Sequence, residues 1–130
     1  MITLSPTFQD FLKQRGFTLE ETKLNGRILI YASYNFKLRI GEDFNGYTSI
    51  DIKRTEDEFK WIELDLLRSY ILKNEDYLEG ISFETAVSFF IGYFENISKV
   101  LSNDLYNSTI TALDLMGNNR ARVIFGIDKI

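Results

Sequence analysis

Hydrophobic and polar residues alternate along two stretches in the first half of the chain. Phe36–Ile40 places two charged residues between three apolar ones, and Thr48–Lys53 repeats the pattern. A period of two puts one face of a strand against a core and the other in solvent. We therefore predict strands at Arg27–Tyr34, Phe36–Ile40 and Tyr47–Arg54, with Leu19–Leu24 as a weaker first strand.

Two dipeptides between these stretches indicate tight turns. Asn25-Gly26 and Asn45-Gly46 both combine residues that tolerate a positive φ, as two-residue hairpin turns require. Hairpins join strands that run antiparallel. The strands should therefore form an antiparallel meander of three to four members.

A different period marks helices on either side of the meander. Ser5 is suited to cap a helix and Pro6 to occupy its first turn, which predicts a helix over about residues 6–15. Gly16 then suits the left-handed position after a helix, with Phe17 packing back on it. We predict a second helix from the apolar spacing of Trp61, Leu64, Leu67, Arg68 and Ile71, with Glu56, Asp57 and Glu58 near its start.

A third helix is predicted after Ser82, where residues 83–101 carry a wide apolar face. Such a face is typical of a helix that is mostly buried or covered by a partner. The remaining segment is ambiguous: Gly117-Asn118-Asn119 reads as a turn, and Arg120–Phe125 as a strand or a helix. The resulting fold class is α+β in a single domain, residues 1–130. It has an N-terminal helix, an antiparallel β-meander, two helices packed on the sheet and an uncertain C-terminal segment.

The amino-acid composition excludes several common kinds of catalytic and metal site. The 130 residues include no cysteine and no histidine, which leaves no thiol nucleophile and no imidazole base. Zinc sites almost always use one of these two residue types. We expect no metal, no cofactor and no catalytic residue, although catalysis by paired carboxylates stays open.

Acidic residues are concentrated in the middle of the chain. The formal net charge is −4, but residues 1–41 carry +3, residues 42–84 carry −7 and residues 85–130 are neutral. This balance disfavours direct binding to nucleic acid phosphates and favours a protein partner with a basic surface. The candidate partner-binding residues are Glu42, Asp43, Asp51, Glu56, Asp57, Glu58, Glu63 and Asp65.

Other side chains on the predicted strands also merit attention. Tyr31, Tyr34 and Tyr47 would be interface anchors if they point outward, and core-edge residues if they do not. Lys37 and Arg39 could form an anion site, or could pair across strands with residues such as Asp51.

The order of elements resembles that of small immunity proteins from bacterial toxin–immunity systems. The resemblance is one of layout over roughly residues 6–101 and rests on Phe11-Leu12, Gly16-Phe17, Ile28–Ile52 and Trp61-Ile62-Glu63-Leu64. It implies a cytoplasmic inhibitor that occludes a toxin domain and works by binding, not by turnover. An acidic surface would suit a nuclease toxin, whose substrate groove is basic.

Three alternatives remain open from the sequence. A secretion-chaperone-like protein would bind an effector segment and could form a homodimer through residues 83–101. An acidic nucleic-acid mimic or a small carboxylate-dependent enzyme would also fit the composition. The charges within Phe83–Leu101 argue against a membrane span, and with no secretory signal recognised we expect a cytoplasmic location.

Overall fold

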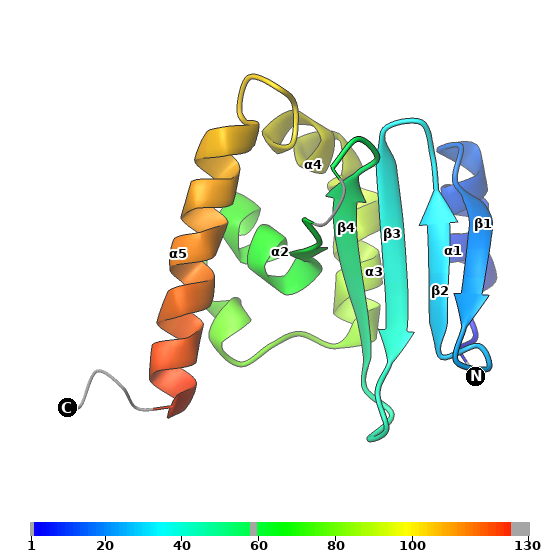
Figure 1. Ribbon diagram of the computed structural model, residues 1–130, viewed down its shortest axis with the longest axis horizontal. Helices are drawn as coiled ribbons and strands as arrows, with labels where there is room; N and C mark the ends of the chain where they lie inside the picture. Colours follow the sequence, from blue (N-terminus) through cyan, green and yellow to red (C-terminus); the bar gives the residue numbers. More distant parts are fainter. Residues whose placement is uncertain (1, 58–59, 126–130) are drawn as a thin grey trace.

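Five antiparallel strands in sequential order form one sheet, and helices precede and follow it (Figure 1). The computed structural model describes residues 2–57 and 60–125. The elements are α1 (Pro6–Gln14), β1 (Thr18–Lys23), β2 (Ile28–Ala32), β3 (Phe36–Glu42), β4 (Thr48–Arg54), β5 (Ile62–Glu63), α2 (Leu64–Leu72), η1 (Asp76–Leu78), α3 (Phe83–Gly92), α4 (Phe94–Val100) and α5 (Tyr106–Phe125). The α+β class and the meander are confirmed. Among the described helices, none combines the length and the hydropathy that crossing a bilayer requires.

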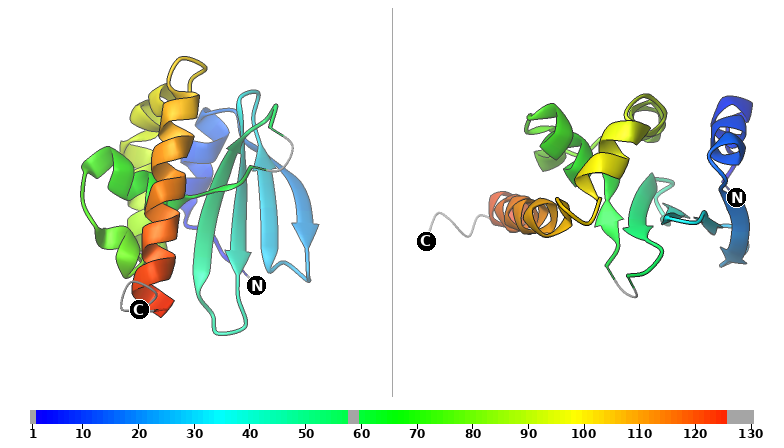
Figure 2. Two further views of the ribbon diagram at one scale, coloured as in Figure 1. Left: turned by 60° about the vertical axis from the view of Figure 1, so that its left-hand side comes forward. Right: turned by 90° about the horizontal axis from the view of Figure 1, so that it is seen from above.

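The helices lie on one side of the sheet and leave its other face open. Figure 2 shows α1, α3 and α4 behind the strands, while α5 stands beyond the edge formed by β4 and β5. One face of the sheet, called the open face below, is therefore not covered by helices.

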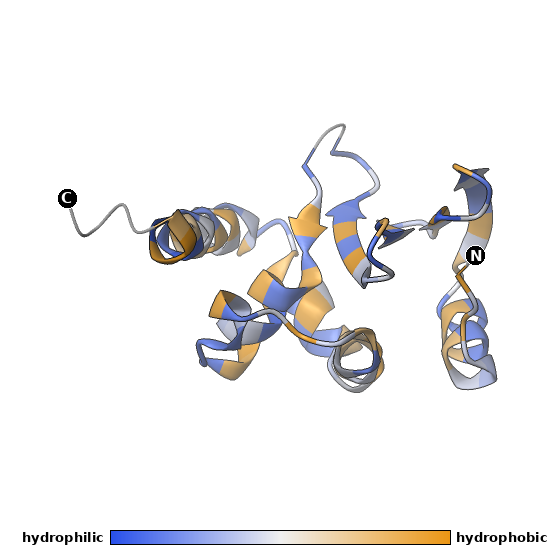
Figure 3. Ribbon diagram, turned by 90° about the horizontal axis from the view of Figure 1, so that it is seen from below, coloured by the Kyte–Doolittle hydropathy of each residue, from blue (hydrophilic) through white to orange (hydrophobic). Residues whose placement is uncertain are grey.

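The alternation predicted for the strands determines which side chains face the helices. Leu38 pairs with Ile52, and Ile40 with Ile50, and all four are almost completely buried. Their neighbours on the open face include Arg39, which lies opposite Asp51 in the register. Figure 3 shows this banding of hydrophobic and hydrophilic colour across the strands.

Phenylalanine rings join the helices to the sheet. Phe90 of α3 makes edge-to-face contacts with Phe8 of α1 and with Phe17, at 6.1 and 6.2 Å between centroids. Phe94 of α4 contacts Phe36 of β3 at 6.2 Å. Such pairs contribute about 0.5–1.5 kcal/mol each beyond their buried area. They hold α4 over the end of β3, which positions the site described below.

The N-terminal helix forms where the sequence predicts it. The Ser5 hydroxyl accepts a hydrogen bond from the Phe8 amide at 3.2 Å, and Pro6 occupies the first turn. Gly16 follows with φ +81°, the left-handed conformation that glycine adopts at low cost. The backbone amide of the buried Phe17 then donates a hydrogen bond to the Leu12 carbonyl at 2.8 Å.

The second predicted helix begins later than its apolar spacing suggests. Trp61 precedes it, and Ile62 and Glu63 pair with Ile52 and Asp51 as the short strand β5. α2 starts only at Leu64. Consequently Glu56 and Asp57 do not lie at a helix start; they belong to the segment between β4 and β5. Glu58 lies outside the described residues.

The predicted helix over residues 83–101 is two helices. α3 ends at Gly92, Tyr93 adopts φ −120° and ψ 21°, and α4 begins at Phe94. This break turns the Phe94 ring toward Phe11, Phe17, Phe36 and Phe90. Within the chain, Phe89, Phe90, Ile97 and Leu101 of this apolar face are buried, and a homodimer through residues 83–101 stays a prediction.

The predicted turn at Gly117-Asn118-Asn119 is wrong, because α5 continues through it. Contacts with other elements account for this outcome. The side-chain amide of Asn119 donates to the Tyr77 hydroxyl at 2.9 Å, and Arg120 forms an ion pair with Glu63 at 2.7 Å. These contacts outweigh the weak helix propensity of glycine and asparagine. Of the two alternatives for Arg120–Phe125, the helix is confirmed.

Candidate functional site

The candidate site is the start of the β4–β5 connection, residues Arg54–Asp57, with a hollow on each side of it. We call the first the terminal hollow, of about 530 Å³, between the β2–β3 turn and the end of α4. We call the second the sheet groove, of about 460 Å³, on the open face. Thr55 and Glu56 line both hollows. This short segment therefore forms the ridge between them.

Arg54 anchors the ridge through a bidentate ion pair. Its Nε and Nη2 donate to the two carboxylate oxygens of Asp57 at 2.8 and 3.1 Å. The third nitrogen, Nη1, donates to Oδ1 of Asn103 at 3.1 Å. Both charged side chains are largely shielded, with about a fifth of each exposed. Paired geometry of this kind fixes orientation as well as adding energy.

Tyr106, the first residue of α5, completes this arrangement. The Arg54 guanidinium lies 3.4 Å from the centroid of its ring. Burial, and then the hydrogen bond to Asp57, raises the pKa of Tyr106 to about 12. The hydrogen bonds from Arg54 hold the pKa of Asp57 below its usual value, and the contact with Tyr106 adds to this effect. Asp57 therefore stays ionised across the physiological range.

Further contacts attach the ridge to neighbouring strands. The Lys53 amine, buried on the open face, donates to the backbone carbonyl of Asp57. The Thr55 amide donates to the Asn35 carbonyl at 2.9 Å, and the Thr55 hydroxyl to the Ser33 carbonyl at 3.2 Å. The backbone of the ridge is consequently fixed from both sides before any partner arrives.

Glu56 is the carboxylate that this ridge presents to solvent. Its side chain is 68% exposed and its Oε1 lies 3.5 Å from Nη1 of Arg54. A single exposed ion pair at that distance contributes little to stability. The Glu56 carboxylate can therefore engage a partner at small cost to the fold.

Three more candidate carboxylates gather at the β4–β5 edge, where arginines partner them. Asp51 accepts from Nε and Nη2 of Arg39 at 3.1 and 2.9 Å, which confirms the cross-strand pairing. Glu63 and Asp65 lie 2.7 and 4.0 Å from Arg120. Burial raises the pKa of Asp51 and of Asp65, and hydrogen bonds to each carboxylate partly offset this rise. Within residues 2–57 and 60–125, no group of acidic side chains is arranged to hold a metal ion.

The remaining two candidates lie at the opposite end of the sheet: Glu42 is the last residue of β3, and Asp43 begins the β3–β4 turn. Asp43 Oδ1 accepts from the amides of Asn45 and Tyr47 at 2.9 and 3.0 Å, so it stabilises the turn itself. Glu42 lies 3.9 Å from Nε of Arg27. The seven described candidates thus fall into three separate places: this turn, the β4–β5 edge and the ridge.

The sheet groove is lined by charged side chains and one aromatic ring. Lys37 pairs with Glu20 at 2.9 Å, and Arg39 lies over the Trp61 ring at 4.6 Å from its centroid. Lys53 lies against the same ring at 5.7 Å. Ile30 forms a buried apolar floor beneath them. Of the seven candidate carboxylates that the structure describes, Glu56 lines this groove and also lines the terminal hollow.

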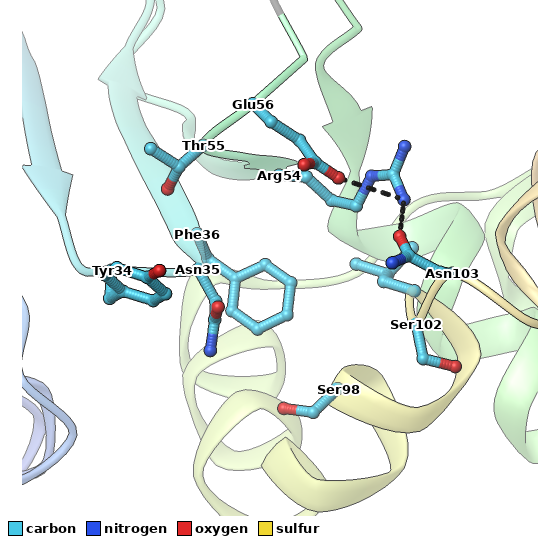
Figure 4. A pocket seen from close by; sticks show the side chains of 10 residues that line it. Tyr34, Asn35, Phe36, Arg54, Thr55, Glu56, Ser98, Ser102 and Asn103 are labelled. Atoms are coloured by element: carbon cyan, nitrogen blue, oxygen red, sulfur yellow. Dashed lines mark hydrogen bonds and ion pairs between the residues drawn. The ribbon is translucent and has the colours of Figure 1, made fainter.

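The terminal hollow has an apolar floor and a polar rim. Figure 4 shows the Phe36 ring at its centre, with Arg54 and Asn103 to one side and Tyr34 to the other. Phe36 and Leu101 are buried, whereas Tyr34 is 94% exposed. The outward orientation considered for Tyr34 is thus found, and Tyr47 is exposed as well, at 76%. Tyr31 is half-buried against the core.

Sequence reasoning missed the residues that build the ridge. Arg54 ends a predicted strand, and Tyr106 lies in the segment that the sequence leaves ambiguous. Trp61, which lines the sheet groove, lies in a predicted helix. The available signal is the close succession of two basic residues, Lys53 and Arg54, and two acidic ones, Glu56 and Asp57, which is typical of a locally paired turn. No family model, curated protein or solved structure matches this chain.

Proposed function

We propose that this domain is a non-catalytic protein-binding module, and that it inhibits a cognate bacterial toxin as an immunity protein does. The observation that carries the proposal is the ridge. It holds an exposed carboxylate, Glu56, on a backbone fixed by Arg54, Lys53 and Thr55. A contact point that is already ordered loses little entropy on binding, which favours tight association.

The surroundings of the ridge supply what a protein interface requires. Tyr34 is an exposed aromatic side chain of the type that dominates binding energy, and it borders a hollow that could receive a partner side chain. On the other flank, the sheet groove offers Trp61 among paired charges. The partner we propose has a basic surface, as the toxin domain of a nuclease would, because Glu56 is the accessible charge common to both hollows.

The test is capture of a toxin domain encoded beside this chain. Co-expression of the full chain with the product of the neighbouring reading frame should yield a stoichiometric complex, and the complex should lack toxin activity. The Glu56→Lys variant should weaken capture, and Glu79→Lys, an exposed glutamate beside η1, serves as the control. If the neighbouring product is no toxin, or if a toxin is neither bound nor inhibited, the proposal is wrong.

A further inference from the structure

We propose that the terminal hollow is the seat of an arginine side chain contributed by the partner protein. This inference rests on the proposed function and names the chemistry that the site would recognise. It is drawn from three properties of the hollow: the hydrogen-bonding capacity of its rim, its charge and its shape.

The serine hydroxyls on the rim have already used their hydrogens. Ser98 donates to the carbonyl of Phe94 at 3.0 Å, and Ser102 donates to the carbonyl of Lys99 at 2.6 Å. What these hydroxyls offer to a ligand is therefore oxygen lone pairs. A ligand that bonds to these two hydroxyls must bring hydrogen-bond donors, and the arginine guanidinium brings five.

The charges at the rim favour a cation over an anion. Arg54 is the guanidinium of the rim, and its charge is already matched by the bidentate contact with Asp57. Glu56 adds a second carboxylate at 3.5 Å from Arg54 and keeps most of its surface exposed. An incoming carboxylate or phosphate would meet Glu56, whereas an incoming guanidinium would pair with it.

The shape of the hollow distinguishes arginine from lysine. Phe36 and Leu101 form an apolar floor on which the methylene stem can pack. Tyr34 stands at the rim with its ring accessible, and a planar guanidinium stacks on such a ring better than a compact ammonium. The volume of about 530 Å³ accommodates the side chain together with its backbone.

A nuclear magnetic resonance titration of the full-length, ¹⁵N-labelled chain tests the inference without the partner. The probes are N-acetyl-arginine amide, N-acetyl-lysine amide and N-acetyl-norleucine amide. The arginine probe should produce saturable shifts at the amides of Asn35, Ser98 and Ser102, and the lysine probe should bind at least threefold more weakly. The norleucine probe should produce no saturable shift.

Variants show whether the rim is responsible. Glu56→Gln should weaken binding of the arginine probe by about fivefold, the upper range for an exposed charge pair. Tyr34→Ala should weaken it to a similar extent through loss of stacking, by about threefold to fivefold. Glu79→Gln should leave it unchanged. Each variant should keep a well-dispersed spectrum, because neither of these exposed side chains contributes to the folded core.

Several results would overturn the assignment to arginine. These are equal binding of the lysine probe, shifts that never saturate, or equal loss in Glu56→Gln and Glu79→Gln. The outcome is separable from that of the proposed function. If the chain captures a toxin but does not bind the arginine probe, this inference alone is wrong. If the arginine probe binds specifically but no toxin is captured, the arginine site is supported and the immunity function is wrong.

Discussion

The guanidinium of Arg54 lies over the ring of Tyr106, 3.4 Å from its centroid, while two of its nitrogens donate to Asp57. The contact joins the end of β4 to the start of α5. Since Tyr106 also lowers the pKa of Asp57, each of the three side chains influences the other two. The ridge is therefore held in place by tertiary contacts.

Removing the charge of Asp57 should loosen these contacts. We expect Asp57→Asn to lower the free energy of unfolding by about 1–2 kcal/mol, because the hydrogen bonds lose their ionic partner. The pKa of Asp57 is lowered in the folded state, so its contribution is present at neutral pH and is lost as the pH falls through that lowered pKa. Urea unfolding at several pH values measures the effect.

The matched control for that variant is Asp10→Asn, on the exposed side of α1. It should change the free energy of unfolding by less than about 0.5 kcal/mol. If both variants lose equal stability at pH 7, or if the difference between Asp57→Asn and the parent persists unchanged at strongly acid pH, the ion pair is not the cause.

Tyr106 gives the protein a dependence on alkaline pH. Its phenol ionises at about 12 in the folded state, against about 10 when unfolded, so the neutral form is favoured by folding. The resulting stabilisation is complete below pH 10 and is lost as the pH rises toward 12. We expect Tyr106→Phe to be less stable at pH 8 by about 1 kcal/mol, and to lose less stability than the parent between pH 10 and 11.

Chemical unfolding at pH 8, 10 and 11 measures this difference. Tyr34→Phe is the control, because the Tyr34 side chain is almost fully exposed. That variant should follow the parent at every pH. A Tyr106→Phe curve that runs parallel to the parent over the same range would contradict the assignment.

Reversing the charge of Glu56 should act on association and not on the fold. Glu56→Lys changes a side chain that is 68% exposed, so the free energy of unfolding should shift by less than about 0.5 kcal/mol. Association with a basic toxin should slow by about fivefold to tenfold at low salt, and its salt dependence should weaken. Stopped-flow or surface-based kinetics at two ionic strengths would show it. An association rate equal to that of Glu79→Lys would exclude Glu56 from the interface.

Gly117 offers a stabilising substitution. It lies within α5, and a Cβ added there would meet the Leu66 side chain at 3.9 Å, an ordinary contact distance. Gly117→Ala should raise the free energy of unfolding by about 0.5–1 kcal/mol, because alanine favours the helix. Gly80→Ala should lower it by about 1 kcal/mol, because Gly80 has φ +85°. Denaturation midpoints of the two variants should therefore move in opposite directions.

Local patterns predict the parts of this fold that local interactions determine. The Ser5 cap, the glycine after α1 and the alternation in β3 and β4 each carry their own signal and are found in the structure. The errors arise where distant contacts decide. Ile62 and Glu63 resemble a helix start until Ile52 and Asp51 are placed beside them. Gly117-Asn118-Asn119 resembles a turn until Asn119 bonds to Tyr77.

The candidate site shows the same division. Charge counting points to the acidic block that contains Glu56, but it treats every carboxylate in the block alike. The partners Arg39, Arg54 and Arg120 come from different elements and pair with three of the candidate carboxylates, Asp51, Asp57 and Glu63. Sequence spacing does not reveal which acids are paired in this way. For that reason Glu56 could not be distinguished from Asp57 before the fold was known.

Trp61 is the single tryptophan of the chain and borders the sheet groove, with Arg39 and Lys53 against its ring. Its fluorescence therefore reports on the open face without any label. A partner that covers this face should displace water and cations from the indole and change its emission. A ligand confined to the terminal hollow, on the other side of the ridge, should leave the emission nearly unchanged. One spectrum would thus locate a binding event on either side of Glu56.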